Sequence, residues 1–201
     1  MKTPHIMAGT AVLLSSFGVA AAQDPSWNVD GSHSAVTFSV RHFFTPVKGQ
    51  FDQLDAELAY DPAAPENSSV RVRVPVASIN TSNERRDGHL KSADFFEAET
   101  YPDITFVSEG VTKVSDTELL VHGSLTIKDQ TRKVDLPVTV LGITDLAPEM
   151  QQAFGGIKQV ASFEAKLTID RRDFGVGVGN WAATAVVGKD VEITIAVEAN
   201  R

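Results

Sequence analysis

Apolar and polar residues alternate along most of this chain with a period of two, which is the pattern of β-strands that have one face in a core and one in water. Val70 to Val76 is a clear case, because its valines share one phase and its two arginines share the other. Pro75 indicates that this strand ends at an edge or a bulge. Strands are predicted at residues 27–30, 35–42, 47–51, 54–60, 70–76, 103–114, 118–127, 133–141, 160–170 and 191–199.

Strands with a single apolar face need one shared interior, which either a β-sandwich or a closed β-barrel provides. A parallel βαβ sheet is not expected, because its strands are apolar on both faces. A barrel of about eight strands either fills with side chains or holds one small ligand. The inward residues here mix Val and Ala with only a few Phe. These small side chains indicate an under-filled interior, so we predict an all-β protein with a cavity.

The alternation stops between Thr81 and Phe106, where charged residues are concentrated. Thr81 and Glu84 have the spacing of a capping box, which predicts the start of a helix, and Ser92 is expected to start a second cap. Gly88 keeps the helix short, because Gly costs about 1 kcal/mol relative to Ala in a helix interior. We expect a short helical insert at about residues 82–97 that lies near one end of the barrel. A second irregular insert is expected at residues 146–158.

The first 22 residues have the composition of a secretory signal peptide. Lys2 precedes a mostly apolar run from Ile6 to Val19, and Ala20 to Ala22 supply small residues for cleavage. The run is too short to cross a bilayer as a helix, and no second long apolar run follows. We therefore predict a signal peptide at 1–22, cleavage near Ala22, and a single domain at 23–201 in the periplasm or outside the cell, with no membrane-spanning segment.

Net charge and the absence of cysteine exclude some partners and some covalent links. Without Lys2 the chain has 17 basic and 26 acidic residues, a formal charge of −9. Such a charge opposes long-range attraction to nucleic acid or to anionic membrane surfaces, so no nucleic-acid partner is expected. The chain has no Cys, and therefore no disulfide.

Motifs for catalysis or metal binding are weak. The mature chain has four histidines (His33, His42, His89 and His122), none at H-x-x-x-H spacing, so no metal site is predicted. There is no G-x-S-x-G nucleophile elbow. Gly177-x-Gly179-x-x-Ala182 fits a dinucleotide fingerprint but lacks the βαβ context that this motif requires. Arg85, Arg86, Asp87 and His89 form either an acid–base cluster or a salt-bridged, solvated helix.

Several short motifs over nearly the whole mature chain form a recognisable set: 27–30, His33-Ser34, 38–42, 49–51, 86–90, 94–96, Tyr101-Pro102, Phe106, 123–127, Arg171 or Arg172 with 173–175, and 187–191. Taken together, these segments resemble the YceI-like family of bacterial periplasmic lipid-binding proteins. One departure is Asp129, where the family often has Gly in a turn.

The resemblance implies an extended antiparallel lipocalin-like barrel whose long apolar pore holds a polyisoprenoid, an isoprenoid quinone or its precursor, or another fatty amphiphile. It also implies frequent homodimers, no catalytic residues, no cofactor other than the bound lipid, and a role in transport, storage or sequestration with a link to stress responses. Because each buried CH₂ contributes about 0.8 kcal/mol, apolar walls alone can supply the affinity.

The apolar phase and this resemblance together give a predicted site. The predicted pore-wall residues are Phe38, Val40, Val72, Val74, Phe95, Phe96, Phe106, Leu125, Leu136, Val138, Phe163, Leu167, Ile169, Phe174 and Trp181. The aromatic residues among them also fit an ordinary core. Polar contacts to a lipid head group are predicted for His42, which shares the inward phase of its strand, and for Arg86, Asp87 and His89.

Two other functions stay open at this point. One is a small secreted enzyme that uses the Arg86, Asp87 and His89 cluster. The other is a structural stress protein whose barrel is filled by side chains. A continuous cavity inside the barrel would favour the lipid carrier, because a barrel filled by side chains has no such cavity.

Overall fold

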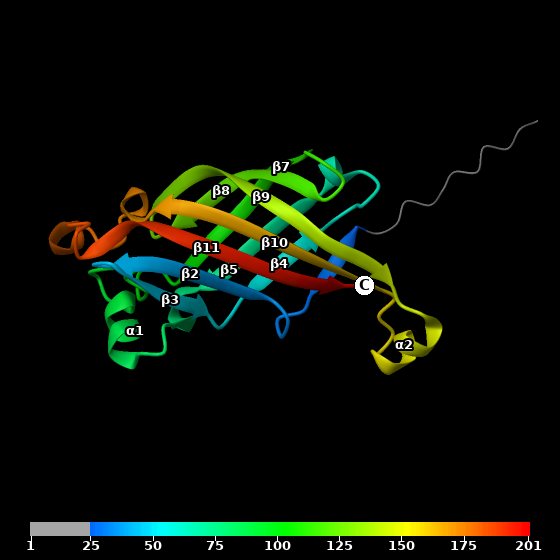
Figure 1. Cartoon of the computed structure of the whole chain (residues 1–201), viewed down its shortest axis with the longest axis horizontal. Helices are drawn as coiled ribbons and strands as arrows, with labels where there is room; N and C mark the ends of the chain where they lie inside the picture. Colours follow the sequence, from blue (N-terminus) through cyan, green and yellow to red (C-terminus); the bar gives the residue numbers. More distant parts are fainter. Residues whose placement is uncertain (1–24) are drawn as a thin grey trace, which may run out of the picture.

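The computed structural model describes residues 25–201 and shows an antiparallel β-barrel (Figure 1). The predicted signal peptide at 1–22 lies outside the described residues. The strands are β1 (Ser26–Val29), β2 (Ala35–His42), β3 (Thr45–Phe51), β4 (Asp55–Ala59), β5 (Ser69–Pro75), β6 (Ile79–Asn80), β7 (Asp103–Lys113), β8 (Glu118–Ile127), β9 (Gln130–Asp145), β10 (Gln159–Asp170) and β11 (Val187–Asn200). The helices are α1 (Glu84–Lys91) and α2 (Pro148–Ala153), with short 3-10 turns η1 (Pro65–Asn67), η2 (Val76–Ser78), η3 (Arg171–Phe174) and η4 (Gly179–Trp181).

The barrel closes in two ways along its length. The strand order is β1-β4-β5-β7-β8-β9-β10-β11, and β1 also pairs with β11, which closes a ring of eight strands. Toward the other end, β11 pairs with β2 instead, and β2 leads through β3 to β6. Since β6 follows β5 along the chain after the single turn η2, β2, β3 and β6 complete the wall at that end by chain connection rather than by a further strand pairing. The closed all-β barrel that the sequence predicted is thus confirmed.

Between the part of β11 that pairs with β2 and the part that pairs with β1, side-chain and loop contacts hold the strand. The last β2 pair is Ala196 with Ala35, and the β1 pairing begins at Ala199 with Val29. Between them, the Ser34 hydroxyl accepts a hydrogen bond from the Glu198 amide at 3.1 Å, and the Asp30 amide donates to the Glu198 carbonyl at 2.9 Å. The His33-Ser34 motif therefore lies where one strand changes its partner.

Alternation along each strand places one apolar face inside. In β8, which has the predicted bounds, residues 119, 121, 123, 125 and 127 are buried and their neighbours are more exposed. The buried apolar residues of the described chain form two clusters. One lies around Phe106, Leu125 and Phe174, and the other lies around Trp27, Tyr60 and Phe163 near β1.

Three local predictions differ from the structure. Asn83, rather than Thr81, caps α1, because its side chain accepts a hydrogen bond from the Arg86 amide at 3.0 Å. Ser92 ends α1 and starts no second helix. The insert predicted at 146–158 contains the short helix α2, while β9 extends from residue 130 to 145 and so is longer than predicted. None of these differences alters the barrel.

Candidate functional site

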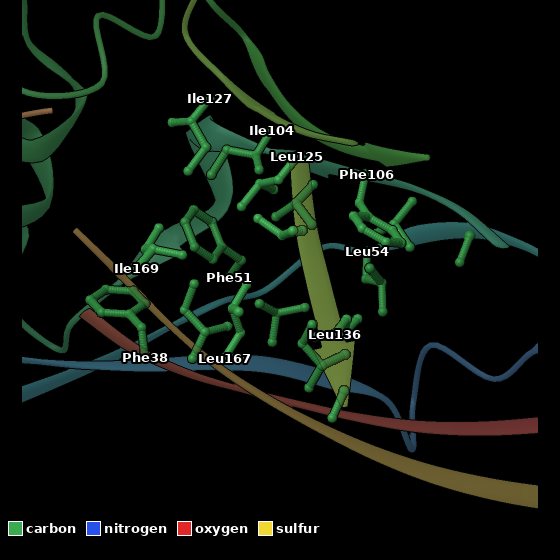
Figure 2. Close-up of a pocket in the computed structure, with 18 of the residues that line it drawn as sticks. Phe38, Phe51, Leu54, Ile104, Phe106, Leu125, Ile127, Leu136, Leu167 and Ile169 are labelled. Atoms are coloured by element: carbon green, nitrogen blue, oxygen red, sulfur yellow. The ribbon is translucent and has the colours of Figure 1, made fainter. Parts of the chain in front are cut away.

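An internal cavity of about 280 Å³ lies along the barrel and is lined by residues from all eleven strands (Figure 2). Leu58 and Tyr60 line it near β1, and Leu90 and Phe95 line it near α1. Apart from Tyr60, Ser68, Ser69 and Arg171, every lining residue is apolar. Figure 2 shows side chains such as Phe38, Leu136 and Leu167 extending from different strands into one common space. The barrel is therefore not filled by its own side chains.

Two glycines keep large rings out of the middle of this space. A Cβ atom on Gly49 would lie 2.4 Å from Cζ of Phe38, its partner across β2 and β3. A Cβ atom on Gly123 would lie 2.5 Å from Cζ of Phe106 on β7. Each phenylalanine ring therefore occupies the space that a Cβ atom on the glycine would fill, an arrangement also used to cover strand glycines in designed sheets. As a result the rings form part of the wall.

Among residues 25–201, Arg171 is the one ionised side chain in the wall, and only 4% of the residue is exposed. Burial lowers the pKa of its guanidinium, but arginine stays protonated in proteins. No carboxylate among residues 25–201 forms an ion pair with it. Its donors reach the carbonyl oxygens of Gly188 at 2.9 Å, Val176 at 2.8 Å, Gly177, Trp181 at 2.8 Å and Val187 at 3.0 Å.

These contacts use all five N–H donors of the guanidinium. Arg171 therefore holds the loop between β10 and β11 in place and has no donor left for a ligand. This role was not predicted, because buried arginines are rare and Arg171 was noted only as part of a family motif.

The segment around α1 covers the end of the cavity opposite β1. None of the residues of α1 is buried, although Leu90 lines the cavity. His89 Nε2 lies 2.9 Å from Asp94 Oδ2, and Trp181 Nε1 donates to the same carboxylate oxygen at 3.3 Å. These hydrogen bonds hold the pKa of Asp94 below its usual value. The His89 ring also packs edge-on against Phe95 and Trp181, at centroid distances of 5.0 and 4.9 Å. These contacts fasten α1 to the loop that contains η4.

The predicted acid–base cluster does not converge on one point. Arg86 Nε donates to Thr81 Oγ1 at 2.7 Å, and the Thr81 hydroxyl donates to Asp87 Oδ1 at 2.5 Å. His89 faces Asp94 instead. Arg86 and Asp87 therefore hold the start of the helical segment together, and His89 belongs to a different set of contacts.

The predicted site residues divide into three groups. Phe174 and Trp181 do not line the cavity: Phe174 is buried in the core beside it, and Trp181 packs on Phe95. None of the four predicted head-group residues lines it either, and His42 is exposed at the tip of the β2–β3 hairpin. The predicted residues that do line the cavity are Phe38, Val40, Val72, Val74, Phe95, Phe96, Phe106, Leu125, Leu136, Val138, Phe163, Leu167 and Ile169.

His42 follows the inward phase of β2, so its exposure has a positional cause. It pairs with Thr45 at the end of the hairpin, next to the two turn residues, where the wall no longer encloses the side chain. Other lining residues were not among the predicted ones, including Phe51, Leu54 and Ala165. Ala165 shares the phase of Phe163 and Leu167 on β10, so the same alternation could have found it.

Two of the polar clusters outside the cavity have the composition of a functional site. Asp30, His33 and Glu198 bring possible metal ligands within 4.8 Å of one another, but His33 is largely exposed and already lies 2.9 Å from Asp30. That contact raises the pKa of His33 and lowers that of Asp30. His122 contacts Thr112 at 3.0 Å and Asp135 at 2.7 Å, in the order of a catalytic triad.

The His122 group lies on the outside of three neighbouring strands and lines neither the cavity nor the shallower hollow beside β1, β4, β5 and β7. Backbone amides in paired strands are engaged in the ladder and are not free to form an oxyanion hole. The contacts of His122 with Thr112 and Asp135 are therefore interpreted as cross-strand pairs that stabilise the sheet.

Comparisons with known proteins agree with this architecture. A UPF0312 protein of Vibrio cholerae is 33% identical over 179 residues, which cover 89% of this chain and 90% of the relative. Protein YceI of Escherichia coli O157:H7 is 32% identical over 199 residues, which cover 98% and 97%.

Two solved structures have the same fold. BcnA of Burkholderia cenocepacia is 29% identical with a TM-score of 0.75, over 85% of this chain and 99% of that one. A polyisoprenoid binding domain from Saccharophagus degradans is 14% identical with a TM-score of 0.66, over 89% and 99%.

Among residues 25–201, no helix is long and apolar enough to cross a membrane. The family model described as the YceI-like domain matches residues 27–199, nearly all of the described chain. With that match and the relatives above, the chain belongs to the YceI-like family.

Proposed function

We propose that this protein is a periplasmic carrier or store for one long-chain apolar lipid, such as a polyisoprenoid or the tail of an isoprenoid quinone. The observation that carries the proposal is the cavity, which reaches from β1 to α1 with an almost uninterrupted apolar wall. A structural relative described as a polyisoprenoid binding domain supports the same class of ligand. The predicted signal peptide at 1–22 supports the location.

The dimensions and chemistry of the cavity favour a narrow hydrocarbon chain. About 280 Å³ is slightly below the roughly 300–1,000 Å³ that is usual for small-molecule pockets. The wall offers no free guanidinium donor, because Arg171 uses all of its own. Affinity would come from apolar burial, at about 0.8 kcal/mol for each CH₂ group.

A polar head group would lie at the α1 end, outside the apolar part of the cavity. Arg86, Asp87 and His89 of α1 and His42 of the neighbouring hairpin supply polar side chains there. A homodimer, a link to stress responses and the absence of enzymatic activity belong to the same proposal.

The alternatives have less support. The acid–base cluster is divided between Thr81 and Asp94, which does not favour an enzyme. The cavity does not favour a filled structural barrel.

Mass spectrometry of an organic extract tests the proposal, using protein purified from its native host. We expect one long-chain lipid at close to one molecule per chain. Ala165 is a small buried residue in the wall, and Ala165→Phe should block the cavity and reduce the lipid recovered. Lys166→Phe places the same side chain on the outer face and is the matched control. Recovery of no lipid from the wild type, or equal recovery from both variants, would contradict the proposal.

A further inference from the structure

The tip of the β2–β3 hairpin has unusual chemistry. His42 pairs with Thr45, so Phe43 and Phe44 form a two-residue turn. Such turns normally use Asn-Gly or another Gly-containing pair, because their backbone requires positive φ values. Phe43 has a φ of +52°, a strained conformation for a bulky side chain. Two phenylalanines in a turn that favours Asn and Gly indicate that the rings are kept for a function rather than for stability.

Both rings are in solvent. Phe44 is 91% exposed and Phe43 is 54% exposed, and Phe44 has the highest exposure of any large apolar residue between 25 and 201. The Phe43 amide donates to the Val186 carbonyl at 2.8 Å, and the Phe43 ring packs edge-on against His42 at 4.8 Å. The turn is thus held to the loop that precedes β11 while the Phe44 ring projects from it.

The hairpin lies at the α1 end of the barrel, together with η3 and η4 (Figure 1). Val40 and Phe51, on its two strands, line the cavity, and so does Val187, which pairs with His42. The exposed rings are therefore close to the end of the cavity that α1 covers. Val178, in the loop at the same end, is also an exposed apolar residue.

Two cations lie behind the rings. Arg41 on β2 and Lys48 on β3 are exposed, and neither forms an ion pair with any residue in the range 25–201. Unpaired cations beside exposed aromatic rings complement the anionic head groups and acyl boundary of a bilayer. The negative charge of the whole chain gives no long-range attraction to such a surface, so the local groups would have to hold the contact.

We propose that the hairpin tip formed by Phe43 and Phe44 inserts into a lipid bilayer and docks the α1 end of the barrel on the membrane. Two rings bury about 300–500 Å² together, which is well below the roughly 800 Å² per partner of a stable protein interface. Reversible insertion into a bilayer has no such minimum area. The choice of a lipid surface as the partner rests on the proposed function, because a membrane would be the source of the lipid ligand.

Cosedimentation with phosphatidylcholine vesicles, with and without phosphatidylglycerol, tests the proposal. The double variant Phe43→Asn/Phe44→Gly should bind vesicles at least about tenfold more weakly, because two buried rings are lost. Since it installs the preferred turn residues, it should unfold at the same temperature as the wild type or a higher one. Phe154→Ser removes a ring that is 56% exposed beside α2, at the opposite end, and should leave vesicle binding unchanged.

The charge contribution has its own variant. Arg41→Ser/Lys48→Ser should weaken binding to vesicles that contain phosphatidylglycerol by about fivefold for each cation, and leave binding to pure phosphatidylcholine nearly unchanged.

Equal vesicle binding by the wild type and the turn variant would overturn the proposal. Sedimentation velocity tests the alternative that the tip contacts a second copy of the chain. If the wild type dimerises and the turn variant does not, the tip is a dimer contact and the proposal of membrane docking is overturned. Binding of a dansyl-labelled long-chain fatty acid, measured without vesicles, should be the same in both proteins. If neither protein binds this probe, the carrier function fails, while a vesicle difference would still support docking.

Discussion

The two ends of the barrel are closed by different chemistry. Near β1, Trp27, Tyr60 and Phe163 pack directly on one another, with Tyr60 and Phe163 edge-to-face at 5.1 Å. At the other end, none of the residues of α1 is buried. This helix is held by the polar contact of His89 with Asp94 and by ring contacts with the loop that Arg171 anchors. When packed apolar groups separate, the full free energy of their burial is lost. When an exposed hydrogen bond breaks, its groups bind water instead, so the net loss of free energy is small. We therefore expect the α1 end to open more readily than the β1 end.

The largest effect is expected from Arg171→Met. The variant leaves several buried carbonyl oxygens without a donor, so the free energy of unfolding should fall by about 4 kcal/mol. Urea denaturation measures it. Arg172→Met is the matched control, because Arg172 is exposed and pairs with Asp170 at the surface, and it should cost less than about 1 kcal/mol. Equal losses for the two variants would show that the polar anchor contributes nothing special.

Trp27→Phe tests the packed end. Trp27 is 4% exposed and its Nε1 donates to the Tyr60 carbonyl at 2.9 Å. Loss of volume and of this hydrogen bond should lower the free energy of unfolding by about 2 kcal/mol. Trp181→Phe makes the same change at the half-buried α1 end and should cost less. The reverse order, measured by urea denaturation, would contradict the comparison of the two ends.

Gly49→Ala sharpens the comparison inside the cavity. The added Cβ meets Phe38 at 2.4 Å and Thr81 at 2.8 Å, so the Phe38 ring must turn into the open space. We expect a loss of about 1.5 kcal/mol in stability together with weaker binding of a dansyl-labelled fatty acid. Gly110→Ala is the control, because nothing lies within 4 Å of its added Cβ, and it should change stability by less than about 0.5 kcal/mol.

His89→Ala should loosen α1 with little effect elsewhere. It removes the contact with Asp94 and the two ring contacts that join α1 to the η4 loop. The loss of about 1 kcal/mol of local stability corresponds to amide hydrogen exchange about fivefold faster across residues 84–91. His122→Ala, on the outer face of β8, should leave that exchange unchanged. Unaltered exchange in His89→Ala would mean that the ring does not fasten the helix.

The smallest effect is expected in acid. The hydrogen bonds from Arg172 lower the pKa of Asp170 from 3.8 to about 2. Because the folded-state pKa is depressed, the pair stabilises the fold fully above about pH 4 and this contribution is lost as the pH falls toward 2. In thermal unfolding between these pH values, the wild type should lose more stability than Asp170→Asn, whose remaining loss comes from other carboxylates with lowered pKa values, such as Asp94. Asp173→Asn controls for the loss of one negative charge and should retain the acid dependence.

The barrel and most of its wall follow from the sequence, because the inward phase of each strand is a local property. For β8 even the bounds agree, and thirteen of the fifteen predicted wall residues line the cavity. Phe174 fails because the turn η3 places it in the core beside the cavity, and a period of two carries no information once a strand has ended.

Contacts between distant segments account for the rest. The carbonyls that bind Arg171 belong to residues 176–188, and nothing in the residue pattern shows that this loop folds back over the arginine. Thr81 has the correct spacing for a helix cap, but Arg86 and Asp87 engage its hydroxyl and Asn83 takes that role. In both cases tertiary contacts override a reasonable local expectation.

The change of partner along β11 has a mechanical consequence. The β1–β4 pair and the β2–β3 pair occupy the same sector of the wall, one after the other along the axis, and no strand pairing joins the two pairs across residues 30–34 and 52–54. Val36, Phe51 and Leu54 of the cavity wall border this seam. Opening the barrel at this seam would break far fewer main-chain hydrogen bonds than separating two long paired strands such as β10 and β11. We therefore expect the barrel to widen at the seam while the remaining strands stay paired.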